Sequence, residues 1–156
     1  MSAGVAEGSL RLADAAATAA LGARLASLLR AGDVVLLSGG LGMGKTSLAR
    51  GVLSALGLAG EAPSPTFAIV QPYAPPEVTL PILHVDLYRI DDPAEIAELG
   101  IDDALYDSAA LIEWPERAGA GRWPDALRFS LTAEADGARR LTWAAPAAWE
   151  PRWRPT

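Results

Sequence analysis

The chain has 156 residues and no cysteine, half of its residues are apolar, and its formal net charge is −6. This length predicts one domain over residues 1–156, with irregular tails at 1–8 and 146–156. The lack of cysteine excludes disulfides and thiolate metal sites, and an acidic surface argues against tight non-specific binding of nucleic acid. No apolar run approaches the ~18 residues that span a bilayer, so we expect a cytoplasmic protein without a membrane segment.

Capping residues and apolar periodicity predict three helices. Asp14 and Asp92 can each cap a helix start, because an aspartate side chain accepts a hydrogen bond from a free backbone N–H group. Pro93 suits the first position of a helix, while Gly57 and Gly100 can end helices in the left-handed conformation. The predicted helices span residues 14–30, 45–56 and 92–100.

Short apolar runs bounded by turn residues predict the strands. Val34–Leu37 is apolar throughout, as expected of a strand buried on both faces. The turns at Pro75–Pro76 and Asp136–Gly137 predict two hairpins. The predicted strands span residues 34–37, 67–73, 80–87, 109–114, 127–132 and 140–144. Together with the helices they predict a three-layer α/β fold with a mixed parallel and antiparallel sheet.

The segment from Gly39 to Thr46 matches the P-loop pattern G-x-x-x-x-G-K-[ST] in full. It follows a buried strand and opens a helix, which is the context that this motif requires. Glycines let backbone N–H groups curl around a triphosphate, Lys45 supplies charge to the β- and γ-phosphates, and Thr46 offers a hydroxyl to Mg²⁺. Lys45 is also the only lysine in the chain. We therefore expect a P-loop NTPase-like fold whose nucleotide contacts come from Gly40, Leu41, Gly42, Met43, Gly44, Lys45, Thr46 and Ser47.

Two acidic residues stand at the ends of predicted strands. Asp86 stands near the end of the apolar strand predicted at 80–87, where a Walker-B-like carboxylate is expected. Glu113 likewise follows the apolar run Ala109–Ile112. Either could hold a water on Mg²⁺, and Glu113 could orient the attacking water. The competing interpretation is that the two acids are helix caps or surface charges.

Three further residues near these strands have two interpretations each. Thr66 lies in a loop that could contact the γ-phosphate, or it is an ordinary turn residue. Trp114 could stack on an adenine or ribose, although core filling is the simpler interpretation. His84 has no cysteine or second histidine with which to share a metal, so we expect a hydrogen-bonded strand histidine.

The order of the motifs resembles the TsaE (also YjeE) family of bacterial P-loop ATPases. The P-loop is followed by the segments SPTF at 64–67, HVDLYR at 84–89, ELGIDD at 98–103 and IEWPE at 112–116. The similarity covers roughly residues 14–133. It implies ATP and Mg²⁺ as cofactors, Thr46 and Glu113 in the metal environment with Asp86 nearby, Thr66 in a switch-like loop, and Trp114 as a nucleotide neighbour.

The resemblance also implies a biological task. Members of this family support the TsaD and TsaB proteins, which transfer a threonylcarbamoyl group to adenosine 37 of tRNA. The ATPase itself does not transfer the group, so we expect weak activity alone, higher activity with the partner complex, and only indirect or weak contact with tRNA. The sequence departs from the family at Gly40, often acidic there, and at Met43, usually a small residue.

The C-terminal segment matches no family motif. It contains Trp149 and Trp153, for which the sequence indicates no role. The arginines of this end form either a solvated basic tail or a local basic patch, at Arg139, Arg140, Arg152 and Arg154.

Three other classes of P-loop protein are alternatives. A small-molecule or nucleoside kinase needs an acceptor pocket and an arginine-bearing lid, which is not evident although Arg89 and Arg117 are available. The guanine-specificity motif N-K-x-D of a GTPase cannot occur, because the chain has no asparagine and its one lysine belongs to the P-loop. A nucleotide-binding module without turnover is possible if Asp86 and Glu113 are structural.

Overall fold

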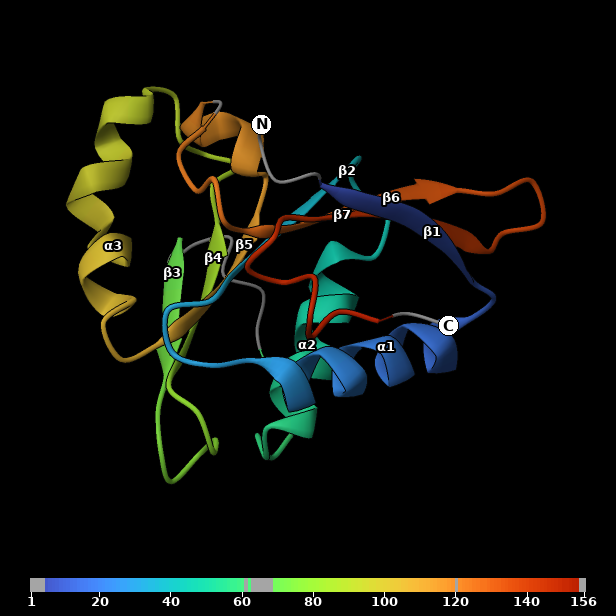
Figure 1. Cartoon of the computed structure of the whole chain (residues 1–156), viewed down its shortest axis with the longest axis horizontal. Helices are drawn as coiled ribbons and strands as arrows, with labels where there is room; N and C mark the ends of the chain where they lie inside the picture. Colours follow the sequence, from blue (N-terminus) through green and yellow to red (C-terminus); the bar gives the residue numbers. More distant parts are fainter. Residues whose placement is uncertain (1–4, 61, 63–68, 120, 155–156) are drawn as a thin grey trace.

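The computed structural model describes residues 5–60, 62, 69–119 and 121–154. A seven-stranded sheet carries helices on both faces, which confirms the predicted three-layer α/β fold (Figure 1). The strands are β1 (Ala6–Leu12), β2 (Val34–Gly39), β3 (Val70–Tyr73), β4 (Ile82–Asp86), β5 (Ala109–Glu113), β6 (Leu127–Ala133) and β7 (Arg139–Ala145). The helices are α1 (Ala15–Leu28), α2 (Lys45–Ala55) and α3 (Ile101–Ala104), with two 3₁₀ helices, η1 (Pro93–Leu99) and η2 (Pro115–Ala118).

Local sequence signals explain where the helices begin and end. The Asp14 carboxylate accepts a hydrogen bond of 2.9 Å from the Ala17 N–H, and Asp92 caps η1 through the Ala94 N–H at 3.0 Å. Gly100 ends η1 in the left-handed conformation, with φ of 75°. Both caps confirm the predictions, but the segment after Pro93 is a 3₁₀ helix rather than an α-helix.

The sheet is mixed, in the order β1-β7-β6-β2-β5-β4-β3. Its centre is parallel, because β2 pairs in parallel with both β6 and β5, and β5 pairs in parallel with β4. The antiparallel β3–β4 pair flanks one side, and β6–β7 with β7–β1 flank the other. Both predicted hairpins are therefore present. The carboxyl ends of β2, β4 and β5 meet at one edge of the sheet, directly before the P-loop and α2.

Alternate side chains of the central strands point into two separate hydrophobic cores. Val35 and Leu37 pack with α1 and α2, whereas Val34 and Leu36 pack with the side covered by η1, α3 and η2. Figure 1 shows α1 and α2 together on one face of the sheet. These two helices approach closely at Gly22, where an added Cβ would lie 2.8 Å from the backbone carbon of Gly51. Among the described residues, no helix is long and apolar enough to cross a membrane.

The two expected irregular tails differ in outcome. Ala6–Gly8 begins β1, which pairs along its whole length with β7, so the prediction of an irregular segment at 1–8 is wrong for these residues. Residues 147–152 form turns, in keeping with the predicted irregular segment, yet Trp149 and Trp153 are only 1% and 3% exposed. The partner of β1 lies more than a hundred residues away, and no local pattern reveals it.

Arg152 anchors the C-terminal segment and is not part of a solvated tail. Its guanidinium donates to the two carboxylate oxygens of Asp33 at 2.7 and 2.9 Å, and to the Leu28 carbonyl at 2.8 Å. The same group lies 4.1 Å from the centre of the Trp149 ring. This cluster joins the end of the chain to the turn before β2.

Candidate functional site

A cavity of about 260 Å³ opens where the carboxyl ends of β4 and β5 face the start of α2. We call it the P-loop cavity. Its lining residues are Leu41, Gly42, Met43, Gly44, Lys45, Thr46, Ser47, Asp86, Glu113 and Trp114. The predicted nucleotide contacts therefore lie together with both predicted carboxylates, except that Gly40 does not line the cavity. Thr66 lies outside the described residues, and its role stays a prediction.

The loop before α2 takes its shape from backbone conformations that favour glycine. Gly44 has φ of 103° and directly precedes Lys45, the first residue of α2. At Gly39, with φ of 143°, an added Cβ would lie 2.7 Å from the Leu131 carbonyl oxygen of the neighbouring strand. The first N–H groups of α2 have no acceptor within the helix, so this loop presents donors and a positive helix end to the cavity.

Lys45 is buried at the centre of the loop. Its Nζ donates to the carbonyl oxygens of Gly39 at 2.6 Å and Gly40 at 2.9 Å, and it lies 4.2 Å from the centre of the Trp114 ring. Burial lowers the pKa of Lys45, against the opposing charge of Glu113 nearby. A lysine with a lowered pKa and carbonyl partners gains from an anionic ligand, because a phosphate restores the charge interactions that burial removes.

Glu113 is the most enclosed acid of the site. Its carboxylate accepts a hydrogen bond from the Thr46 hydroxyl, 2.9 Å from Oε1, and its Oε2 lies 2.6 Å from His84 Nε2. Both Glu113 and His84 are almost fully buried. The expected hydrogen-bonded strand histidine is confirmed, although its partner was not predicted.

Asp86 stands beside Glu113, because the two residues are direct neighbours in the parallel register of β4 and β5. Its Oδ1 accepts a hydrogen bond of 2.9 Å from the Tyr88 N–H. Burial raises the pKa of Asp86, and the nearby charge of Glu113 acts in the same direction. The two neighbouring carboxylates and the Thr46 hydroxyl are oxygen ligands of the kind that Mg²⁺ prefers.

Trp114 lines the P-loop cavity and also packs against the core on the side of η1, α3 and η2. It is half-buried, its backbone is left-handed with φ of 58°, and its ring contacts that of Tyr88 at a centroid distance of 4.8 Å. A tryptophan rarely adopts this backbone conformation, and such strain gathers at functional sites. The conformation turns the ring toward Lys45.

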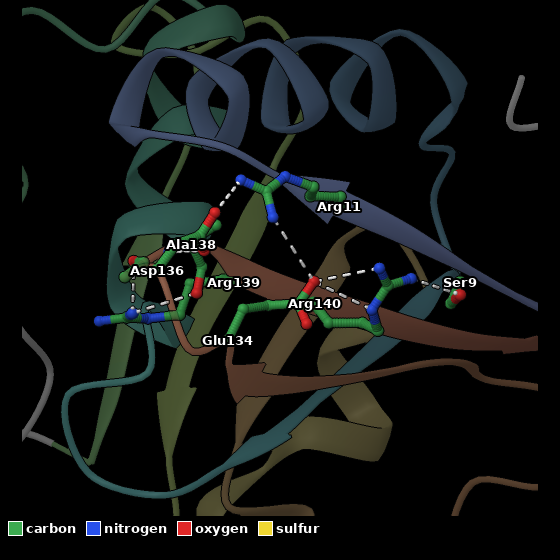
Figure 2. A network of polar contacts seen from close by, with 8 residues as sticks. Ser9, Arg11, Glu134, Asp136, Ala138, Arg139 and Arg140 are labelled. Atoms are coloured by element: carbon green, nitrogen blue, oxygen red, sulfur yellow. Dashed lines mark hydrogen bonds and ion pairs between the residues drawn. The ribbon is translucent and has the colours of Figure 1, made fainter.

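An arginine of β7, which sequence reasoning did not place here, reaches the loop from the opposite side. Arg139 donates to the Gly42 carbonyl at 3.3 Å and to the Gly137 carbonyl at 2.9 Å. Figure 2 shows Arg139 on the β6–β7 hairpin, within a polar network where Arg11 contacts Asp136 and Arg140 contacts Glu134. In the sequence, the only indication of this contact is that Arg139 belongs to a group of arginines near the C-terminus.

A second cavity, of about 230 Å³, adjoins the loop on this side. We call it the hairpin cavity. It is lined by Leu12, Ala13, Asp14, Ala15, Thr18, Gly42, Gly44, Ser47, Gly137 and Arg139. Gly42, Gly44 and Ser47 line both cavities, so the two form neighbouring compartments along one loop.

The parallel central strands and the glycine-rich loop ahead of α2 define a P-loop protein of the α/β class. Comparison with known proteins narrows this class. The family model described as "Threonylcarbamoyl adenosine biosynthesis protein TsaE" matches residues 12–141. The chain belongs to the TsaE family.

Individual relatives agree with the family model. The tRNA threonylcarbamoyladenosine biosynthesis protein TsaE of Streptomyces coelicolor is 44% identical over 112 residues, which are 71% of this chain and 76% of that protein. The protein of the same name from Mycobacterium tuberculosis is 42% identical over 106 residues, which are 64% of this chain and 63% of that protein. A solved structure described as "Crystal structure of Bacillus subtilus YdiB" superposes with a TM-score of 0.78 at 26% identity, covering 93% of this chain and 89% of that one.

Proposed function

We propose that the chain binds ATP together with Mg²⁺ in the P-loop cavity and hydrolyses the bond between the β- and γ-phosphates. The observation that carries the proposal is the contact between the Thr46 hydroxyl and Glu113 within the same cavity as Lys45. A P-loop threonine next to a strand-end carboxylate is the arrangement by which such proteins hold a nucleotide-bound Mg²⁺.

The residues present fit both groups. Mg²⁺ in nucleotide sites takes one or two carboxylates, with a hydroxyl where one is present, and completes its shell with phosphate oxygens and water. Thr46, Glu113 and Asp86 provide such a set, whereas in the described part of the chain no three His, Cys, Asp or Glu side chains gather into a cage of their own. The loop N–H groups and Lys45 supply the positive partners for a triphosphate.

Each residue has a distinct task in the proposed reaction. Lys45 exchanges its carbonyl partners for phosphate oxygens, and the N–H groups at the start of α2 hold the β-phosphate. Glu113 and Asp86 would hold Mg²⁺ through its water shell, and they orient the water that attacks the γ-phosphorus while the bond to the leaving ADP oxygen breaks. When bound, Mg²⁺ neutralises charge on the phosphates.

The two cavities suggest the direction in which the nucleotide lies. The γ-phosphate belongs beside Lys45 and Glu113, so the nucleoside end points along the shared wall of Gly42, Gly44 and Ser47 into the hairpin cavity. Trp114 then neighbours the terminal phosphates rather than the adenine. This refines the expected role of Trp114, since its ring already faces Lys45.

We further propose that hydrolysis supports the TsaD–TsaB complex in forming N6-threonylcarbamoyladenosine at position 37 of tRNAs in the cytoplasm. Support comes from family membership and from the names of the relatives, which are called tRNA threonylcarbamoyladenosine biosynthesis proteins. The net charge of −6 favours protein partners over direct tRNA binding. The alternative is a small-molecule or nucleoside kinase.

ATP hydrolysis by the chain alone and with TsaD and TsaB tests these proposals. We expect weak activity alone and stimulation by the partners, whereas phosphorylation of a nucleoside or metabolite would establish the kinase instead. Lys45→Ala and Glu113→Gln should each lower kcat by about 100-fold or more, because each removes charge placed for the transition state. Glu95→Gln is the matched control, since Glu95 is an exposed carboxylate on η1 and lies outside the family motifs. Near-normal turnover by Glu113→Gln would remove that residue from the mechanism.

A further inference from the structure

The only histidine of the chain, His84, is fully buried and contacts Glu113, but the reaction proposed above assigns it no task. We propose that His84 is a positioning residue that fixes the orientation of the Glu113 carboxylate toward Thr46. This inference rests on the proposed ATPase function for its kinetic consequence, while the contact itself is independent of that function.

The strand register brings the two side chains together. His84 lies opposite Leu111 in the parallel β4–β5 pair, two residues before Asp86, which lies opposite Glu113. Residues two apart on a strand share a face, so His84 and Asp86 both point to the face that carries Glu113. His84 thus reaches Glu113 from within the sheet, while Asp86 flanks it at the cavity.

Glu113 is held at both oxygens. His84 Nε2 lies 2.6 Å from Oε2, and the Thr46 hydroxyl lies 2.9 Å from Oε1 and 3.1 Å from Oε2. Because a carboxylate rotates about its last bond, a second donor on a different element restrains its plane more strongly than the single Thr46 hydroxyl does. His84 is anchored in β4 and Thr46 in α2, so the plane of the Glu113 carboxylate follows the packing of a helix on a strand.

A competing partner explains why this restraint matters. Lys45 lies close enough for its charge to interact with that of Glu113. A free carboxylate would be drawn toward the ammonium group, and the pair would then block both the phosphate-binding lysine and the metal-binding acid. Contact with His84 holds Glu113 away from that arrangement and keeps Lys45 available for phosphate.

The hydrogen bond defines which nitrogen carries a proton. A carboxylate only accepts hydrogen bonds, so Nε2 must be the protonated nitrogen in this contact. Nδ1 is buried and has no hydrogen-bond partner in the described part of the chain. A buried N–H without an acceptor is more unfavourable than the same donor paired with Glu113, which favours the proton on Nε2.

Kinetics of two variants separate positioning from packing. His84→Leu removes the donor, whereas His84→Gln can return an amide N–H near the place of Nε2. We expect kcat of His84→Leu to fall by about 10- to 100-fold, with a higher Mg²⁺ requirement and little change in KM for ATP, and His84→Gln to recover most of the loss. Tyr73→Phe, on the neighbouring strand β3, removes a buried hydroxyl that has no hydrogen-bond partner among the described residues and does not touch Glu113, so it should behave as the wild type.

Normal turnover by His84→Leu, or equal losses in His84→Leu and His84→Gln when both melt as folded proteins, would overturn the proposal. Nitrogen NMR of the nucleotide-free protein, as wild type and as Glu113→Gln, gives a readout that does not depend on hydrolysis, and the single histidine makes its signals self-assigned. A protonated Nε2 whose signal shifts in Glu113→Gln supports the proposal, whereas an unprotonated Nε2 or an unshifted signal refutes it. Absence of ATP hydrolysis by the wild type would instead refute the proposed function and leave this readout intact.

Discussion

Replacement of Arg152 by methionine measures how much the C-terminal segment contributes to stability. The substitution keeps an unbranched apolar stem but removes a guanidinium that forms three hydrogen bonds and packs on Trp149. The side chains of Arg152 and Asp33 are only 14% and 12% exposed, so the pair is largely shielded from water. Removing one partner of a fully buried pair costs about 3–5 kcal/mol; for this less enclosed pair we expect about 2–3 kcal/mol.

Urea unfolding followed by tryptophan fluorescence gives the free energy of unfolding, and heating gives the melting temperature. A loss of about 2–3 kcal/mol corresponds to a fall of roughly 4–12 °C for a domain of this size. Arg154→Met is the control, because Arg154 is exposed and should lose less than about 0.5 kcal/mol. Combining Arg152→Met with Asp33→Asn should cost less than the sum of the two single changes.

A loss below about 0.5 kcal/mol in Arg152→Met would refute this reasoning, since an unpaired Asp33 would then be tolerated without penalty. Additive losses in the double variant would show that the two residues are not coupled.

Two further substitutions test the packing and the electrostatics of the site. Gly22→Ala should lower the free energy of unfolding by about 1–3 kcal/mol, because its Cβ would meet the backbone of Gly51, and unchanged urea unfolding would contradict the close approach of α1 and α2. Asp86→Asn should stabilise the nucleotide-free protein at pH 7 while lowering ATP hydrolysis: burial raises the pKa of Asp86, so its ionised form is disfavoured in the folded state. The gain should disappear as the pH falls through the raised pKa, where wild-type Asp86 is protonated, and a loss of stability at pH 7 would contradict the prediction.

The parts of the fold that local chemistry controls were predictable. Helix starts at Asp14 and Asp92 follow from side chains that satisfy nearby N–H groups, and the β2 strand follows from an unbroken apolar run. The hairpins followed from turn residues. Such signals act over a few neighbouring residues, so they can be recognised in the sequence without knowledge of the fold.

Features that depend on distant partners were missed. β1 exists because β7 offers its edge, and Trp149 is buried because the segment after β7 folds back beneath Arg152. At the site, strand ends identified Asp86 and Glu113 as neighbours of the P-loop, but the contact of Arg139 with Gly42 depends on the placement of the β6–β7 hairpin. Periodicity does not encode the order of strands in the sheet.

The close approach of Gly39 to the Leu131 carbonyl has a consequence for comparing sequences within this family. That glycine is demanded by the neighbouring strand β6, so it would persist in a descendant that had lost every trace of nucleotide chemistry. The presence of this glycine therefore indicates the fold and not nucleotide binding. No close backbone approach of the sheet requires the side chains of Lys45 and Thr46. Replacement of these two residues would therefore identify an inactive descendant in a genome.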